Sequence, residues 1–297
     1  MDINVEEWKS KGDFFKFKEF DIFYLQEGSG EDLLIIHGYP YNSFEWKDSI
    51  AELSKTFRVT TFDLLGMGFS SKPKKHRYSY EEYCEIVNEL LEKLAIKQVH
   101  IFAHDLGVSV AQELIARQEE SKNSFKINST AFMNGSLFID VYKPRLIQKI
   151  LSKSPTFIGK TLSTIMTKNM VNKSVKSVFG KDTQPSNDFL DKQWEILNYN
   201  DGKKITYLIG RLVFEKYNYL NRWVTAMQKT TIPMCYIYGP ADPNSGTHMA
   251  ERYKVLVPKP RIYPLREAIG HWPLLEDREN MLLKFYTFIN DVKNNYR

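Results

Sequence analysis

The amino-acid sequence predicts an α/β protein with a mostly parallel, doubly wound sheet and an inserted group of helices. Three observations lead to this prediction. Short apolar strand patterns alternate with helical patterns from residue 33 to residue 133, as in open parallel sheets. The alternation stops between about residue 135 and residue 230, where only helical patterns occur. A strand pattern returns at residues 234–238, so the insertion divides the sheet-forming chain in two.

Each expected element has its own pattern. Residues 14–17 and 21–25 are short and strand-like, and Gly28 and Gly30 mark the turn after them. Residues 33–36 form a continuous apolar run, which is typical of a strand buried on both faces. The elements that follow alternate in type: helix 43–55, strand 58–62, helix 79–94, strand 98–103, helix 107–118 and strand 127–133.

We expect two domains. Residues 1–135 and 230–297 form the core domain, with a last strand at residues 261–263 and a closing helix at residues 273–290. Residues 136–229 form a helical cap, because proline and glycine interrupt the helical patterns there and no pattern of a buried strand occurs.

Composition restricts the class of protein. A chain of 297 residues with 42% apolar residues is long enough to bury a core and to enclose a pocket for a small-molecule substrate. Two cysteines, Cys84 and Cys235, indicate neither a disulfide framework nor a cysteine zinc site. The chain starts without the apolar region of a secretory signal, and no run approaches the ~18 apolar residues of a membrane span. We therefore expect a cytoplasmic protein, and no motif indicates a cofactor or a metal.

Positive charge is concentrated in the insertion. Residues 141–183 hold nine basic residues and one acid, so this segment carries +8 whereas the whole chain carries +5. Apolar residues occur there at helical spacing, which favours amphipathic helices with solvated lysines. Weak association with an anionic membrane surface is the alternative interpretation. Nucleic acid is not an expected partner, because arginine and interleaved aromatic residues are scarce in the segment.

The most informative segment lies at a strand-to-helix junction. The sequence Phe102-Ala-His-Asp-Leu-Gly107 places the small residues Ala103 and Gly107 two positions before and two positions after Asp105. A sharp turn between a strand and a helix needs such small neighbours, and it lifts the central side chain above the carboxyl edge of the sheet. Asp105 is therefore the candidate nucleophile.

Two further candidates follow Asp105 in the chain. Asp242 comes after the strand that follows the insertion, and His271 precedes the closing helix. A neutral His271 is suited to activate water as a general base, and Asp242 is suited to orient it as an Asp–His charge pair.

An early loop, His37-Gly-Tyr-Pro40, follows the buried run at residues 33–36. The backbone N–H of Tyr39 can form an oxyanion hole together with the N–H of Leu106, the residue after Asp105. We expect His37 and His104 to support loop backbones rather than to react.

With these motifs the chain resembles the α/β-hydrolase superfamily, and within it the aspartate-nucleophile branch of epoxide hydrolases and haloalkane dehalogenases. The order nucleophile, acid, histidine is that of α/β hydrolases. The Asn221-Arg-Trp-Val224 and Tyr238-Gly-Pro240 stretches, with the lysine-rich insertion, look most like the mesoderm-specific transcript proteins. The resemblance covers essentially the whole chain and rests on five ordered motifs: His37-Gly-Tyr-Pro40, Asp63-Leu-Leu-Gly-Met-Gly-Phe-Ser70, His104-Asp-Leu-Gly107, Asp242-Pro243 and Gly270-His-Trp-Pro273.

The resemblance implies a hydrolase in which Asp105 attacks an sp³ carbon and forms an alkyl ester that water, activated by His271, then hydrolyses. Haloalkane dehalogenases typically hold the halide with a tryptophan after the nucleophile, where this chain has Leu106, and Tyr39 stands where asparagine is usual. We therefore expect epoxide-hydrolase-like activity on a small apolar or lipid-derived substrate. The alternatives are a haloalkane dehalogenase and a non-enzymatic binding protein with the same fold.

Epoxide hydrolases use phenol groups of the cap to protonate the opening ring oxygen. Tyr217 and Tyr219 lie just before Asn221-Arg-Trp223, near the position that the resemblance gives to the second cap tyrosine. Both are candidate proton donors, and the sequence does not choose between them.

Overall fold

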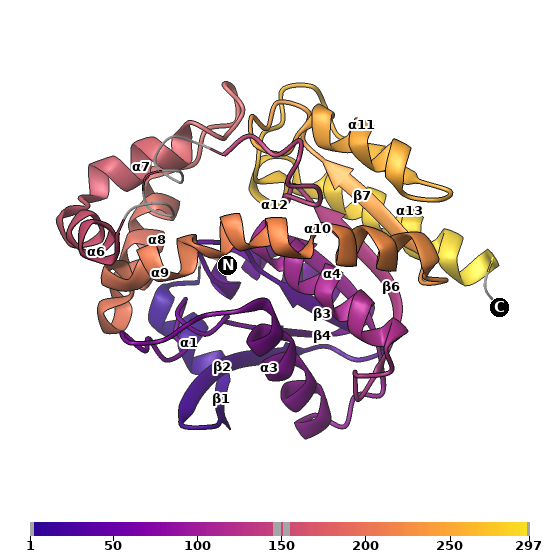
Figure 1. The fold of residues 1–297 in the computed structure, drawn as a ribbon, viewed down its shortest axis with the longest axis horizontal. Helices are drawn as coiled ribbons and strands as arrows, with labels where there is room; N and C mark the ends of the chain where they lie inside the picture. Colours follow the sequence, from indigo (N-terminus) through magenta and orange to yellow (C-terminus); the bar gives the residue numbers. More distant parts are fainter. Residues whose placement is uncertain (1–2, 145–149, 151–154, 296–297) are drawn as a thin grey trace.

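The computed structural model describes residues 3–144, 150 and 155–295, and its centre is a twisted sheet (Figure 1). Within these residues the sheet has eight strands in the order β1-β2-β4-β3-β5-β6-β7-β8. Strands β3 to β8 pair in parallel, whereas β2 pairs with β1 and β4 in antiparallel fashion. The strands are β1 (Asp13–Phe17), β2 (Phe20–Glu27), β3 (Glu31–Ile36), β4 (Phe57–Phe62), β5 (Gln98–His104), β6 (Lys126–Met133), β7 (Met234–Tyr238) and β8 (Arg261–Pro264).

The register of the central strands brings three loops to one edge of the sheet. Ile36, the last residue of β3, pairs with Phe62 of β4 and with Ala103 of β5. The residues that follow these strands therefore emerge side by side at the carboxyl edge, which is where open α/β sheets bind their ligands.

Helices cover both faces of the sheet, and each face has its own apolar core. Helices α3, α4 and α11 pack in one core, and α1, α2 and α13 pack in the other. This arrangement confirms the predicted doubly wound α/β fold. The helices around the sheet are α1 (Val5–Lys11), α2 (Lys47–Leu53), α3 (Tyr80–Lys93), α4 (Leu106–Glu119), α11 (Thr247–Leu256), α12 (Pro273–Glu276) and α13 (Arg278–Asn295).

The structure differs from the sequence prediction at the ends of the chain. The expected closing helix at residues 273–290 is two helices, because Asp277 has a non-helical backbone (φ −153°, ψ 52°) that separates α12 from α13. Helix α1 was not predicted, although Asn4 and Glu7 form a capping box at its start.

In the described part of the chain, five α-helices and one 3₁₀ helix (Tyr199–Ile205) lie between β6 and β7. In Figure 1, α6 to α9 are on the left and α10 crosses the centre. In the described part of residues 136–229 no strand occurs. The last of these helices packs against core helix α4, where Trp223 Nε1 and Arg222 Nε donate to Glu113 at 2.8 and 2.9 Å. The division into a core domain and a cap domain stays a prediction. The five helices are α6 (Thr156–Ile165), α7 (Lys168–Lys176), α8 (Asn187–Asn198), α9 (Thr206–Gly210) and α10 (Leu212–Lys229).

Candidate active site

Asp105 lies on a strained turn between β5 and α4. Its backbone has φ 49° and ψ −110°, a combination that residues other than glycine rarely adopt. The turn brings α4 so close to β3 that a Cβ on Gly107 would lie 2.3 Å from the carbonyl oxygen of Ile36. Glycine at position 107 is therefore a steric requirement, and the turn presents the Asp105 side chain at the carboxyl edge of the sheet.

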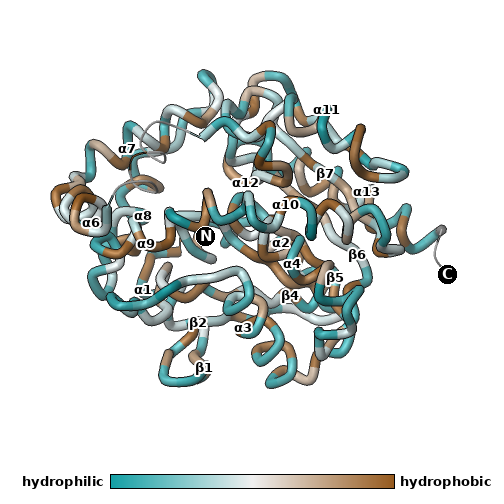
Figure 2. The backbone as a smooth tube through the Cα atoms, viewed as in Figure 1, coloured by the Kyte–Doolittle hydropathy of each residue, from teal (hydrophilic) through white to brown (hydrophobic). Residues whose placement is uncertain are grey.

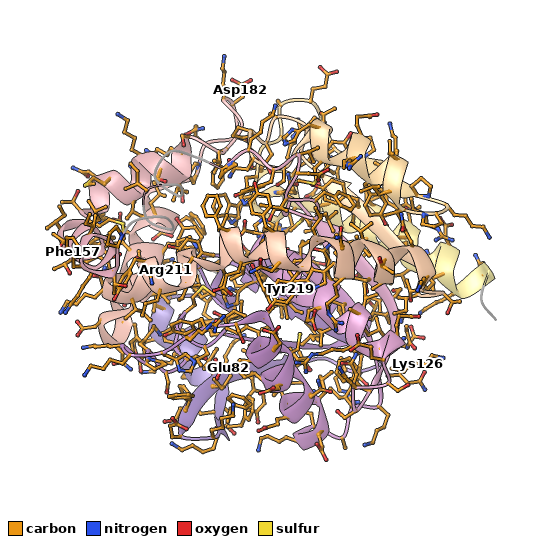
Figure 3. The ribbon with its side chains drawn as sticks, in the orientation of Figure 1. Glu82, Lys126, Phe157, Asp182, Arg211 and Tyr219 are labelled. Atoms are coloured by element: carbon orange, nitrogen blue, oxygen red, sulfur yellow. The ribbon has the colours of Figure 1, made fainter. Side chains whose placement is uncertain are left out.

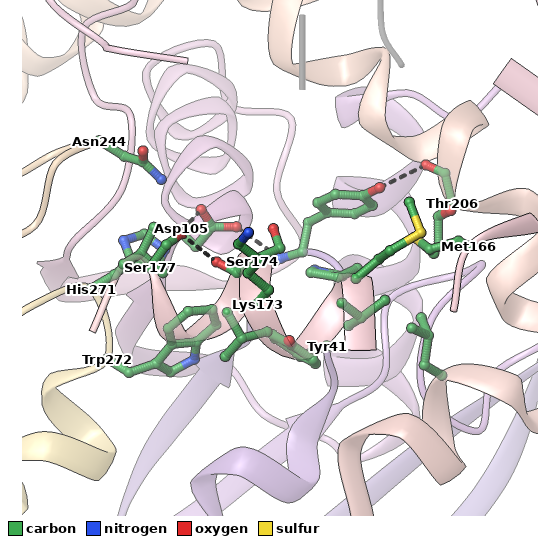
Figure 4. A pocket seen from close by; sticks show the side chains of 17 residues that line it. Tyr41, Asp105, Met166, Lys173, Ser174, Ser177, Thr206, Asn244, His271 and Trp272 are labelled. Atoms are coloured by element: carbon green, nitrogen blue, oxygen red, sulfur yellow. Dashed lines mark hydrogen bonds and ion pairs between the residues drawn. The ribbon is translucent and has the colours of Figure 1, made fainter. Parts of the chain in front are cut away.

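The loop after β3 holds one oxygen of the Asp105 carboxylate. A Cβ on Gly38 would lie 2.5 Å from the Cβ of Asp105, so only glycine allows this approach. The backbone N–H of Tyr39 then donates to Asp105 Oδ1 at 2.8 Å (Figure 4). If water attacked an ester of Asp105, negative charge would develop on Oδ1. The Tyr39 amide already donates a hydrogen bond to this oxygen. The amide of Leu106, the first residue of α4, stays a prediction as the second donor.

The structure brings together the three residues that the sequence placed on separate loops. His271 Nε2 lies 3.4 Å from Asp105 Oδ2, and its Nδ1 lies 2.7 Å from Asp242 Oδ2. Figure 4 shows the imidazole of His271 directed at the Asp105 carboxylate. His271 and Asp242 are each 3% exposed, so their charges interact with little screening by solvent.

Asp242 is held by neighbours that the sequence analysis did not identify. Ser245 Oγ and Asn134 Nδ2 donate to Asp242 Oδ2 at 2.6 and 2.9 Å, and the backbone N–H of Asn244 donates to Oδ1 at 2.8 Å. Asn134 directly follows β6, and its place at the carboxyl edge of a predicted strand is a signal that could have identified it. These donors fix the carboxylate that orients His271.

Opposing effects set the protonation of the site. Burial raises the pKa of Asp105, but the hydrogen bond with His271 and its charge outweigh burial and hold the pKa below its usual value. For Asp242, burial also raises the pKa, and the charge of His271 produces a net decrease. Burial lowers the pKa of His271, yet the charge of Asp242 and hydrogen bonds with both carboxylates raise it to about 10. The raised pKa favours the protonated form of His271 while both carboxylates are charged. The neutral His271 expected for the step that activates water stays a prediction.

The two histidines expected to support loops are fully buried at loop junctions. His37 Nε2 accepts from the N–H of Leu64 at 3.0 Å, so its Nδ1 carries the proton and donates to Gly38 O at 2.8 Å. His104 Nε2 donates to the backbone oxygen of His271 at 2.8 Å.

The structure does not bring Tyr217 or Tyr219 to Asp105, and neither is among the described residues that line the cavity next to it. Tyr217 is 57% exposed. Tyr219 donates its hydroxyl to Glu81 Oε1 at 2.5 Å and stacks on Trp223. Both tyrosines are on α10, and the packing of α10 on α4 turns them away from the site. The structure thus shows no contact between either tyrosine and Asp105, and the identity of the proton donor stays a prediction.

Lys216, on the same helix, is a further buried residue that the sequence analysis missed, and like the two tyrosines it is not among the described residues that line the cavity. It is 4% exposed, and its Nζ donates to the hydroxyl of Ser136 on the loop after β6. Burial lowers the pKa of Lys216 to about 8, although the charge of Asp105 acts in the opposite direction. Lys216 shares the buried face of α10 with Leu212 and Trp223, and a lysine on an apolar helix face is unusual. This pattern in the sequence could have indicated a functional lysine.

A cavity of about 450 Å³ opens beside Asp105 and His271, which is within the size range of small-molecule sites. In Figure 4 these two residues lie at one end of the cavity, and Met166 and Thr206 lie at the other. The hydroxyl of Tyr39 donates to Thr206 O at 2.9 Å across the cavity. Most of the remaining wall is apolar: Tyr41, Val171, Val175, Val178, Leu197 and Trp272.

The fold and the arrangement of the site define an α/β hydrolase. The model of the α/β hydrolase fold family matches residues 33–277, so the chain belongs to this family. The chain is similar to the mesoderm-specific transcript homolog protein of Bos taurus, with 34% identity over 295 residues, 96% of this chain and 88% of the relative. The resemblance stated from the sequence is thereby confirmed.

Two solved structures show the same fold. Haloalkane dehalogenase DatA from Agrobacterium tumefaciens superimposes with a TM-score of 0.80 at 16% identity, over 95% of this chain and 97% of that one. The Cif epoxide hydrolase from Acinetobacter nosocomialis gives a TM-score of 0.76 at 21% identity, over 93% of this chain and 88% of that one. None of the helices in the described part of the chain combines the length and hydropathy needed to cross a bilayer.

Proposed function

We propose that the chain is an epoxide-hydrolase-like enzyme that acts through a covalent ester on Asp105, on an apolar or lipid-derived substrate. The observation that supports this most is the state of the Asp105 carboxylate. One oxygen accepts from the Tyr39 amide, and the other lies beside His271 at the end of an apolar cavity. A carboxylate at this point suits displacement at an sp³ carbon, whereas acyl transfer would need a hydroxyl.

In the first step Asp105 Oδ2 bonds to a ring carbon of the epoxide and the carbon–oxygen bond of the ring breaks. The released alkoxide takes a proton from Lys216 Nζ. Lys216 thus takes the role that the sequence assigned to Tyr217 or Tyr219. Its buried ammonium and a pKa of about 8 suit a general acid near neutral pH.

The ester changes the protonation of His271. Alkylation removes the negative charge of Asp105, which is one cause of the raised pKa of His271. His271 then releases its proton to solvent and becomes a base, while Lys216 takes up a proton from solvent. It deprotonates water, which attacks the Asp105 carbonyl while the Tyr39 N–H stabilises the oxyanion. Collapse of this intermediate breaks the ester carbon–oxygen bond, and the alkoxide that leaves takes the proton held by His271 to complete the diol. The remaining carboxylic proton of Asp105 returns to His271.

Haloalkane displacement is the second candidate, because it needs the same carboxylate and because the dehalogenase DatA has the same fold. Haloalkane displacement needs no proton donor. Leu106 argues against this reaction, because leucine offers no indole N–H to a halide. A non-enzymatic binding protein is the third candidate, and the cavity alone would serve it.

Mass spectrometry of the intact protein separates the three. His271→Gln should retain alkylation and lose hydrolysis, so an epoxide panel should leave an adduct with the mass of the substrate. Asp105→Asn is the control and should show no adduct. In the wild type, turnover in ¹⁸O-water should place label in the Asp105 peptide, because water attacks the ester carbonyl. Adducts and bromide release only with bromoalkanes would favour the dehalogenase, and no adduct with any substrate would reject both enzymes.

A further inference from the structure

Helix α6 (Thr156–Ile165) exposes three of its four large apolar side chains, and only Leu162 is partly buried. Phe157 is 70% exposed and Ile165 is 59% exposed. The buried residues of the helix are instead Gly159 and Ser163. A surface helix of a globular domain has the opposite arrangement, with its apolar face toward the core.

Contacts with α9 set this orientation. Gly159 lies against the ring of Tyr207, where an added Cβ would come within 2.9 Å of a ring atom. The hydroxyl of Ser163 lies 3.1 Å from the hydroxyl of Thr206 in a buried hydrogen bond. A half-turn of α6 about its axis would press Phe157 into the space that only glycine fits. The outward direction of the apolar residues is therefore imposed by packing.

A further exposed apolar side chain lies on α7, the next helix of the chain, beside the cavity. Ile158 is 36% exposed and Met170, on α7, is 51% exposed. Met170 also lines the cavity beside Asp105. Figure 2 shows hydrophobic residues on α6 at the edge of the molecule, and Figure 3 shows Phe157 projecting there. By contrast, exposed Val255 and Leu283 belong to α11 and α13, on other parts of the surface.

The same helices are positively charged. Residues 155–181 contain five lysines and no acidic residue. Lys160 is on α6, next to the exposed apolar residues, and Lys176 ends α7. Arg145, Lys149 and Lys153, which the sequence analysis counted in the basic segment, lie outside the described residues. Apolar residues flanked by lysines are the composition of a helix that lies in the interface of an anionic membrane.

We propose that this docking face, formed by Phe157, Ile158, Ile165 and Met170 with Lys160 beside them, lies on an anionic lipid surface, and that the other lysines of α6 and α7 add to its positive potential. Phe157 and Ile165 would enter the region between headgroups and acyl chains, and the lysines would contact lipid phosphates. Met170 would bring the cavity wall next to the lipid. A second copy of the chain fits less well, because a symmetric contact would place the acid-free segment 155–181 against itself.

The first experiment places a fluorescent probe on the face. Cys84 and Cys235 are both 0% exposed, so an introduced cysteine can be labelled selectively in the folded protein. Phe157→Cys, labelled with the environment-sensitive dye NBD, should shift its emission to the blue with vesicles of phosphatidylcholine and phosphatidylserine. Val255→Cys, at an equally exposed position, is the matched control and should not shift. Equal shifts at both sites, or none at either, would overturn the proposal.

The second experiment measures partition onto the same vesicles by flotation. Phe157→Ser with Ile165→Ser should weaken partition at least tenfold at any salt concentration, because apolar insertion is lost. Lys160→Gln with Lys176→Gln should weaken it about fivefold per lysine at low salt, with little effect at 1 M salt. If wild type and both double variants partition alike, the face does not bind lipid. Concentration-dependent self-association that the serine variant abolishes, without vesicle binding, would instead assign the face to a second copy.

Discussion

The Nε2 atom of His104 donates a hydrogen bond of 2.8 Å to the backbone oxygen of His271. On the other side of the ring, His104 Nδ1 lies 3.5 Å from Oε1 of buried Glu45. Glu45 Oε2 accepts from Trp272 Nε1 at 2.9 Å. His104, the residue before Asp105, is thus connected to the loop of His271 and Trp272 directly and through Glu45. These buried contacts set the distance between the side chains of Asp105 and His271.

We predict that His104→Ala lowers kcat at least tenfold by releasing this loop, since small displacements of reacting groups cost large factors in rate. His100→Ala is the matched control, because His100 is also a buried histidine of β5 and bonds Ser129 Oγ at 2.7 Å. Both variants should lose about 1–3 kcal/mol in urea unfolding. A similar fall in kcat for both variants would show that lost stability, not the contact with His271, is responsible.

Lys216→Met should lower epoxide turnover by about 10²- to 10⁴-fold, the usual contribution of a general acid. Because the acid must be protonated, wild-type activity should fall as pH rises through about 8, the pKa of Lys216. That alkaline decline should be absent in Lys216→Met. Steady-state rates from pH 6 to pH 10 test this, and unchanged epoxide rates in Lys216→Met would remove Lys216 from the mechanism even if Asp105 is alkylated.

Lys216 should also reduce the stability of the fold. Burial lowers its pKa in the folded protein to about 8, below the value of about 10.4 for the unfolded chain. Between these values the unfolded state binds more protons, so the free energy of unfolding should rise with pH. Lys216→Met should therefore be more stable than wild type at pH 7, by up to about 3 kcal/mol. Urea unfolding should show that the difference in free energy of unfolding between Lys216→Met and wild type is smaller at pH 9.5 than at pH 7. The same difference at both pH values would contradict the prediction.

Tyr217→Phe and Tyr219→Phe should leave epoxide turnover within about twofold of wild type. Tyr217 is 57% exposed, so its hydroxyl has no buried role. Tyr219 loses its bond to Glu81, which should reduce the free energy of unfolding by about 1 kcal/mol. Kinetics and urea unfolding of both variants provide the check. A hundredfold loss of turnover in either would restore that tyrosine as the acid.

Much of the fold could be predicted because its strands carry local signals. The apolar run at residues 33–36 is β3, buried on both faces, and Gly107 marks the turn that presents Asp105. The chain order of Asp105, Asp242 and His271 sufficed to place all three at one sheet edge, because parallel strands end there together. Each of these inferences depends on a short segment and on one rule of sheet topology.

The sequence by itself therefore determined the α/β fold, the position of the strained turn and the three residues that meet at it. The tertiary structure decided which way each helix faces. Successive residues of a helix point about 100° apart, so the packing of α10 on α4 directs Lys216 inward and Tyr217 outward. The packing of Gly159 against Tyr207 likewise turns Phe157 toward solvent. These directions depend on contacts between residues far apart in the chain, and local patterns do not contain them.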